Sequence, residues 1–214
     1  MADTGAATPD YDTSVFINCP FDPAYQPMFD ATVFAVMACG HVARSALEID
    51  DGGRVRFAKI ADLIGQCRYG IHDISRTDMS SAGGLPRFNM PLELGLFLGA
   101  VHYGSDAQRR KQCLVMDSDR TRYRDFISDL SGHDIKAHGN VPAQAIAAVR
   151  DFLRSASGMR LPGGKAVAAL HARFTTDLPE ILRQARIGPD EMTFADTTAI
   201  IFEWLKQQGT PAGR

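Results

Sequence analysis

The sequence predicts an α/β fold in which a parallel sheet is covered on both faces by helices. Short β-rich runs alternate along the chain with helical segments of ten or more residues, the pattern of parallel strands joined by crossover helices. The run Gln112–Asp117 is largely apolar, as strands buried on both faces tend to be. The 214 residues are enough for one domain of about 150 residues and an appendage.

Each expected element has a local signal. A helix at 28–39 has helical periodicity and ends at Gly40, a common C-terminal signal. A third helix is expected in the apolar run that contains Pro91 and Glu93. Pro91 suits the first helical position, and the absence of a polar face predicts that this helix is buried on all sides. Further helices are expected at 57–67 and 142–155, with a short helix and a turn in 125–134. The expected strands are 15–18, 41–47, 69–75 and 112–117.

Composition divides the chain into three parts. Residues 1–13 are small and polar and are expected to be a disordered leader, followed by an α/β domain at 14–156. A Gly, Ser and Pro-containing linker then leads to a helical appendage at 165–208, with short helices expected at 165–173, 178–186 and 195–208. The apolar side chains of the last helix predict that it packs on the α/β domain or on another subunit, so a homo-oligomer through these helices is one expectation.

Several functional classes lack their usual signals. The net charge of −2 argues against nucleic-acid binding, and no run of about 18 apolar residues predicts a membrane span. The cysteines are far apart without a CxxC pair, which favours reduced thiols in a cytoplasmic protein. Neither GxGxxG, a P-loop, GxSxG nor HExxH occurs, so hydride transfer, ATP hydrolysis and a zinc site have no motif to support them.

Polar residues collect where the expected strands end. Because the carboxyl ends of parallel strands meet at one edge of the sheet, where ligands of such folds bind, we expect a site there. These residues are Asn18 and Asp22 after the first strand, Arg44 and Glu48 at the second, Asp73, Ser75 and Arg76 at the third, and Asp117 and Asp119 after the fourth.

Two carboxylates stand out as candidates for chemistry. Glu93 lies in the expected first turn of an otherwise apolar helix, where it either complements the helix dipole or takes part in catalysis. Asp73 ends an interior strand, where it either caps a loop or faces a cleft. If the two converge, repulsion raises one pKa, and the pair suits a nucleophile and a general acid at an acetal-like carbon.

Arginine and histidine side chains give weaker signals. Arg44 and Arg87 are candidate anchors for phosphate or carboxylate, although Arg44 has an ion pair with Glu48 as its alternative. His72 precedes Asp73 on a strand, so the two side chains should point to opposite faces. A structural role is the simpler interpretation of His72.

Three segments carry a family resemblance: FINCPFD at 16–22, HDIS at 72–75 and MPLELGLFLGA at 90–100. Together they resemble the nucleoside 2-deoxyribosyltransferase family and its TIR-like relatives over roughly residues 15–117. The resemblance implies a flavodoxin-like fold and cleavage of an N-glycosidic bond. Related TIR-type domains cleave NAD or sense nucleotide-derived signals in bacterial immunity.

The resemblance also implies roles for single residues. Glu93 matches the catalytic glutamate and Asp73 the supporting aspartate. We therefore expect an N-glycosidase or glycosyltransferase acting on a nucleoside, nucleotide or NAD, without a metal or prosthetic group. A non-catalytic sensor of a nucleotide signal and an interaction module with a structural Glu93 are the alternatives. The expected substrate-binding residues are Asn18, Pro20, Phe21, Asp22, Tyr25, Arg44, Ser75, Arg87, Phe88 and Asn89.

Overall fold

Within the described residues, the sheet has five strands, all parallel. The computed structural model describes residues 10–49, 51–76, 88–210 and 212–213. The strand order is β2-β1-β3-β4-β5, which is the flavodoxin-like order, and the predicted fold is confirmed. The strands are β1 (Ser14–Asn18), β2 (Val42–Ser45), β3 (Tyr69–Asp73), β4 (Gln112–Asp117) and β5 (Lys136–Ala137).

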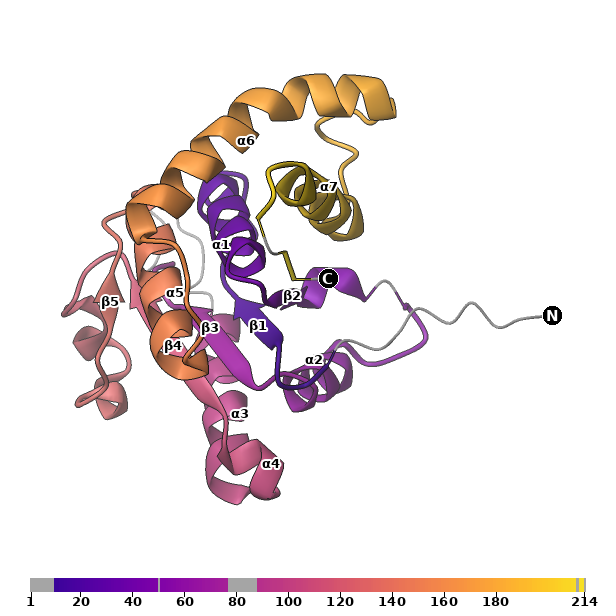
Figure 1. Cartoon of the computed structure of the whole chain (residues 1–214). Coiled ribbons are helices and arrows are strands. Elements are labelled where there is room, and N and C mark those ends of the chain that lie inside the picture. The colour runs from indigo at the N-terminus through magenta and orange to yellow at the C-terminus, as the bar shows by residue number, and fades with distance from the viewer. Residues whose placement is uncertain (1–9, 50, 77–87, 211, 214) are drawn as a thin grey trace.

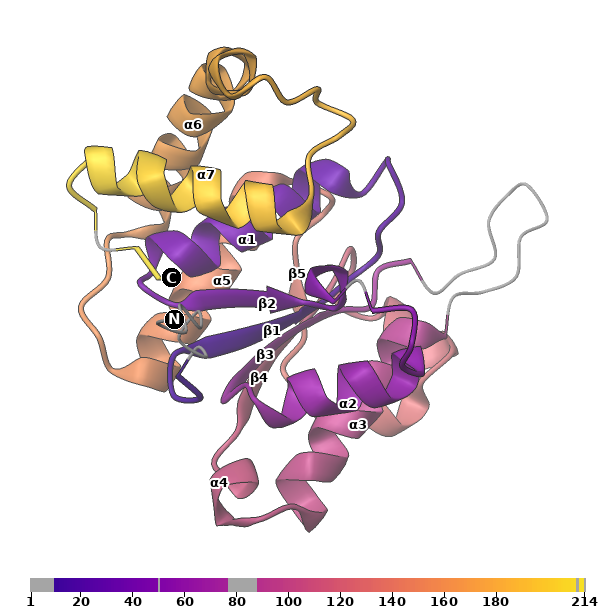
Figure 2. The same ribbon diagram turned by 90° about the vertical axis from the view of Figure 1, so that its right-hand side faces the viewer.

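Helices cover both faces of this sheet (Figures 1 and 2). α1 (Gln26–Ala38) and α5 (Pro142–Ser157) pack together on one face, and α2 (Arg56–Gly65) and α3 (Asn89–Tyr103) pack on the other. The one-turn helix α4 (Asp106–Arg109) precedes β4. Strand residues alternate between the two sides: Ile17 and Ile71 belong to the core under α1, whereas Phe16 packs in the core under α2 and α3.

The C-terminal helices form an additional layer over α1 and α5, as Figure 2 shows. Three short helices were expected, but the structure has two: α6 (Gly164–Ala185) and α7 (Phe194–Gln207). The break expected between residues 173 and 178 is absent: α6 runs unbroken from Gly164 to Ala185, with Pro179 inside it. Proline lacks the N–H that Thr175 would accept in a regular helix. Both residues are exposed, so this local loss of a hydrogen bond occurs at the surface of the helix.

The apolar faces of α6 and α7 are continuous with the core of the α/β domain. The ring of Phe34 in α1 lies 5.3 Å from that of Phe174 in α6 and 6.0 Å from that of Trp204 in α7. α1 is therefore enclosed by the sheet on one side and by the tail on the other. This explains why α1 is buried along almost its whole length and lacks a polar face.

The prediction that α3 is buried on all sides is wrong. The helix begins at Asn89, so Pro91 is its third residue and Glu93 lies beyond the first turn. The buried side chains of α3 are Met90, Leu94 and Phe97, whereas Leu92 is 53% exposed. α3 contacts the sheet, α2 and α4, and its Met90 and Leu94 share a core cluster with Tyr123 and Leu130, whereas side chains such as Leu92 on its other side are exposed.

No helix in the described part of the chain is both long and apolar enough to cross a membrane. All four cysteines are free. Most of the expected leader, residues 1–9, lies outside the described residues. Its last residues are ordered, because Tyr11 donates its hydroxyl to the carbonyl of Ala107 at 2.7 Å.

Candidate functional site

The carboxyl edge of the sheet carries three buried polar side chains, one from each of the central strands. Asn18 ends β1, Asp73 ends β3 and Asp117 ends β4, and they are 2%, 0% and 0% exposed respectively. The parallel register pairs Asn18 with His72 and Asp73 with Met116, so these strand ends are level with one another. Buried polar groups require partners. Their partners define the candidate site.

Asn18 ties β1 to the beginning of α3. Its side-chain amide donates to the carbonyl oxygen of Met90 at 2.8 Å and lies 3.0 Å from Nδ1 of His72. Burial lowers the pKa of His72 to about 3, so this ring is neutral and its Nδ1 accepts from the amide. The ring of His72 packs edge-on against Phe97 of α3 at 5.0 Å. His72 thus faces α3.

Asp73 points to the opposite face, as the alternation along a strand predicted. Its Oδ2 accepts a hydrogen bond from the hydroxyl of Tyr25 at 2.5 Å, and its Oδ1 accepts one from the backbone N–H of Ser75 at 2.9 Å. Oδ2 also lies 2.8 Å from Nε2 of His138, close enough for an ion pair although poorly aligned for a hydrogen bond. Burial, together with the charge of Asp73, raises the pKa of Tyr25. The tyrosine therefore stays protonated as a donor.

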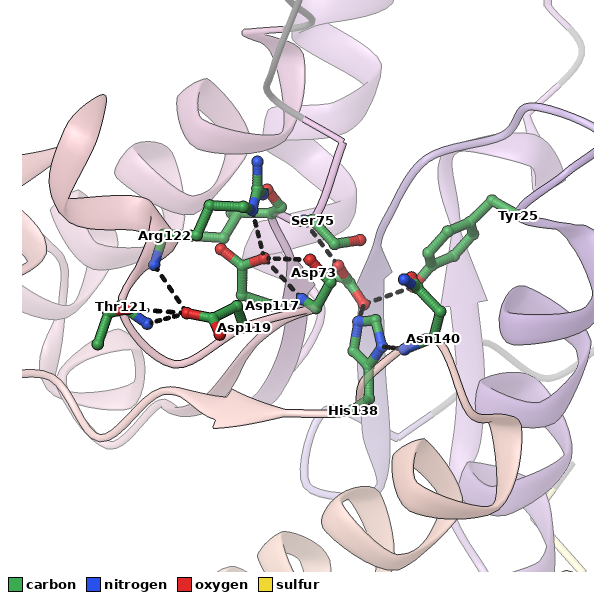
Figure 3. A network of polar contacts seen from close by, with 11 residues as sticks. Tyr25, Asp73, Ser75, Asp117, Asp119, Thr121, Arg122, His138 and Asn140 are labelled. Carbon is green, nitrogen blue, oxygen red and sulfur yellow. Dashed lines mark hydrogen bonds and ion pairs between the residues drawn. The ribbon is translucent and has the colours of Figure 1, made fainter. Parts of the chain in front are cut away.

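The loop after β5 supplies His138 to this network (Figure 3). The backbone N–H of Asn140 donates to Nδ1 of His138 at 3.0 Å, which leaves the proton of a neutral ring on Nε2, facing Asp73. Gly139 and Asn140 both have positive φ, 54° and 59°, and this tight turn brings the Asn140 N–H back to the ring. His138 was not predicted from the sequence, because β5 has only two residues and the Gly-Asn turn after it is a weak local signal.

Asp117 and Ser75 each carry a polar atom that has no hydrogen-bond partner among the described residues. Oδ1 of Asp117 accepts from Ser118 N–H at 2.6 Å and from Arg122 Nε at 2.9 Å (Figure 3). Its Oδ2, like Oγ of Ser75, is buried without a partner in the described part of the chain. Burial raises the pKa of Asp117, and Arg122 opposes that rise. Buried polar atoms without a partner are uncommon in folded proteins, so this pair marks the ends of β3 and β4 as part of the candidate site.

Glu93 lies on the α3 side of the sheet, at a small cavity. The cavity measures about 130 Å³ and is lined by Arg56, Phe57, Ile60, Asn89, Leu92 and Glu93. Burial raises the pKa of Glu93 to about 7, and the charge of Arg56 opposes that rise. The carboxyl group therefore changes its charge near neutral pH. A titrating carboxyl in a cavity beside an aromatic ring and an arginine is a feature of functional sites.

Glu93 and Asp73 lie at the same sheet edge but do not touch within the described structure. The pKa of Glu93 is raised by burial and not by repulsion from Asp73. Both carboxylates are near the buried thiol of Cys19, because each adds to the rise in the pKa of that thiol after burial itself. The two carboxylates are separated because they lie on opposite faces of the sheet. Glu93 is on α3, the side that His72 faces, whereas Asp73 points towards α1.

The first loop adds further candidates. Pro20 is buried, and Phe21 is 37% exposed with its ring edge-on to Phe29 at 5.5 Å. Asp22 accepts from the backbone N–H of Tyr25 at 3.1 Å and lies 3.9 Å from Nη2 of Arg76. These contacts shape the loop between β1 and α1 and place Tyr25 over Asp73.

The remaining candidates are scattered. Arg44 forms a two-pronged pair with Glu48, through Nε and Nη2 at 2.9 and 2.6 Å, so the ion-pair alternative is the one observed. Phe88 and Asn89 are exposed at the start of α3, and Asn89 lines the Glu93 cavity. Arg87 lies outside the described residues. Arg56 and Phe57 were missed, because they were assigned only to an amphipathic helix or its flank.

Among the described residues, no group of three or more His, Cys, Asp or Glu side chains is arranged to hold a metal ion. Comparison of the chain with protein-family models, curated proteins and solved structures gives no match. The function of the protein is therefore inferred from the geometry of the carboxyl edge and from the sequence resemblance.

Proposed function

We propose that the protein is an N-glycosidase or glycosyltransferase that cleaves the base–ribose bond of a nucleoside, nucleotide or NAD. The observation that carries this proposal is the Glu93 carboxyl, which lines a cavity at the carboxyl edge of the sheet and has a pKa of about 7. The resemblance of HDIS and MPLELGLFLGA to nucleoside 2-deoxyribosyltransferases assigns the catalytic glutamate to this same position. The free cysteines suit a cytoplasmic enzyme acting on cytoplasmic nucleotides.

The chemistry assigns a role to each group at the cavity. The departing base takes the electron pair of its bond to C1′, and the ionised Glu93 stabilises or captures the positive ribosyl centre. Water or a second base then attacks C1′, giving hydrolysis or transfer. With NAD, nicotinamide leaves as a neutral base and needs no proton. Phe57, 50% exposed, offers a face for stacking, and Arg56 offers a charge for phosphate.

Asp73 acts in this proposal as a positioning residue. Tyr25, Ser75 and His138 already surround its carboxylate, so it holds the β1–α1 loop and the loop after β5 at the edge of the site. Oγ of Ser75 and Oδ2 of Asp117, which have no partner among the described residues, are buried, so contact with ribose hydroxyls would require local opening of this edge. Phe21 and Phe88, both exposed, remain candidates for stacking on the base.

The second candidate is a non-catalytic sensor that binds a nucleotide-derived signal in the same pocket. The contacts of Asp73 favour it, because a carboxylate that is enclosed by three groups of its own chain is not free to move a proton to or from a substrate. In this alternative the C-terminal helices assemble copies of the chain. Such assembly would use their outer faces, since the inner ones pack on α1.

The test is release of base from a panel of NAD, nucleosides and nucleotides, resolved by chromatography. Glu93→Gln should lower release by about a hundredfold or more while the fold is retained. The matched control is Glu203→Gln on the exposed side of α7, which should leave turnover unchanged. Equal release by the wild type and Glu93→Gln contradicts the enzyme proposal. If no base is released but a nucleotide raises the melting temperature, and Glu93→Gln abolishes that rise, the sensor is supported.

A further inference from the structure

A pair of joined cavities lies away from the Glu93 site, where α6 and α7 cover α1. The inner cavity measures about 220 Å³ and has mainly apolar walls, including Pro27, Phe174, Leu178 and Ile200. The outer cavity measures about 620 Å³ and shares Asp30, Leu178, Met192 and Thr197 with the inner one. It extends to Phe21 and Pro23 in the β1–α1 loop. Figure 2 shows α7 lying across α1 beneath α6.

Asp30 stands where the two cavities join. Its carboxyl accepts one hydrogen bond from the side-chain amide of Gln26 at 2.8 Å, and no other donor contacts it in the described part of the chain. Asp30 is half-buried, and this burial raises the pKa of its carboxyl. A partly dehydrated carboxylate with one neutral donor has capacity for a cationic partner.

The described residues that line the two cavities favour a bound cation, and no positively charged side chain among them competes for Asp30. Of the described residues that line either cavity, none is lysine or arginine, and Asp190 adds a second carboxylate to the outer cavity. His171 lines the inner cavity, but burial lowers its pKa, so it stays neutral at pH 7. Thr175 also lines the inner cavity. Its carbonyl oxygen has no helical N–H donor, because the residue four positions later is Pro179.

We propose that these cavities bind a small organic amine, with its ammonium group on Asp30 and its apolar body between α1, α6 and α7. The size fits: an apolar cavity of about 150 Å³ accepts benzene, so the inner cavity at about 220 Å³ accommodates one ring with a short side chain. The ammonium replaces the hydration that burial removes from Asp30. This site takes a ligand class different from that of the Glu93 cavity and does not depend on the proposed function.

The probes are 2-phenylethylamine and its neutral counterpart 2-phenylethanol. Binding is measured by calorimetry and by the fluorescence of Trp204, the one tryptophan of the chain, whose ring lies 5.5 Å from that of the cavity residue Phe174. The wild type should bind the amine about tenfold or more tightly than the alcohol, since only the amine forms a charge-assisted hydrogen bond with Asp30.

Asp30→Asn keeps the shape and removes the charge, so it should weaken amine binding by about tenfold and leave alcohol binding within about twofold. The matched control is Asp106→Asn, an exposed carboxylate on α4 that lines neither cavity, which should change neither affinity by more than about twofold. Ile200→Phe narrows the inner cavity and should weaken both compounds. Absence of amine binding at about millimolar concentration overturns the proposal. Equal affinity of the wild type for amine and alcohol also overturns it, even if Asp30→Asn fails to fold.

Discussion

The side-chain amide of Asn18 donates to the carbonyl oxygen of Met90 at 2.8 Å, joining the end of β1 to the first turn of α3. Both residues are buried, and Glu93 follows Met90 by less than one helical turn. A single contact between residues 72 positions apart thus fixes where the candidate catalytic carboxyl lies relative to the sheet.

Asn18→Ala should destabilise the protein by about 1–3 kcal/mol, because the carbonyl of Met90 and Nδ1 of His72 both lose their buried donor. Urea denaturation measures the loss. The matched control is Asn89→Ala at the exposed start of α3, expected to change stability by less than about 0.5 kcal/mol. Equal effects of the two substitutions would show that the Asn18 contact does not anchor α3.

Glu93 should make stability depend on pH. Its pKa rises from 4.5 in the unfolded chain to about 7 in the native one, so the native state binds more protons between these values. Stability contributed by the protonated group is therefore present at low pH and is lost as pH rises through about 7. Glu93→Gln should raise the melting temperature more at about pH 8 than at about pH 4.5. A pH-independent difference between the two proteins would contradict the shifted pKa.

Base release should follow the ionised form of Glu93. If the carboxylate stabilises the ribosyl centre, turnover rises with pH and levels off above the pKa of about 7. The pH profile of kcat/KM on the best substrate of the panel measures this. A profile that instead falls as pH rises through about 7 assigns Glu93 the role of a general acid.

Tyr25→Phe should cost about 1.5–3 kcal/mol, because the fully buried Asp73 carboxylate loses a hydroxyl donor at 2.5 Å. The matched control is Tyr11→Phe, which removes a hydroxyl from a neutral carbonyl at 2.7 Å in a partly buried position. It should cost about 0.5–1.5 kcal/mol. Thermal and urea unfolding of the two variants should therefore rank Tyr25 above Tyr11, and the reverse order would show that Asp73 does not depend on this contact.

Removal of residues 158–214 should give an insoluble or partly unfolded chain. The truncation exposes the face of α1 that contains Phe34 and that α6 and α7 now cover. Light scattering and far-UV circular dichroism measure the outcome. A soluble, monomeric, fully helical truncated protein would show that the tail contributes little to the core.

The α/β class followed from the sequence because alternating β-rich and helical runs are a local signal. The prediction that His72 and Asp73 point to opposite faces of the sheet is confirmed, and it too followed from a local rule, the alternation of side chains along a strand. The exposed side of α3 was not predictable, because burial depends on which element packs outside a helix, and the composition of α3 does not contain that information. Likewise, separate helices were predicted at 165–173 and 178–186, but α6, which packs on α5 and α1, is one helix through both ranges.

At the site, the sequence identified single residues better than their pairing. Asp73 and Asn18 were expected at the sheet edge and lie there, whereas His138, which contacts Asp73 from the loop after a two-residue strand, left no periodic pattern. Arg44 was a candidate anchor, but Glu48, four residues later, binds it. The local pair of Arg44 with Glu48 was already an alternative from the sequence, whereas the contact of His138 with Asp73, between distant segments, was not visible there.

The packing of α7 on α1 has a consequence for synthesis of the chain. Phe34 and Trp204 are separated by roughly 170 residues, so α1 leaves the ribosome long before α7, which packs on its outer face. At about 5–20 residues per second, that face waits roughly 10 to 30 seconds for its partner. During this interval the nascent chain presents an apolar helix to the cell, which makes α1 the segment where chaperones are expected to bind.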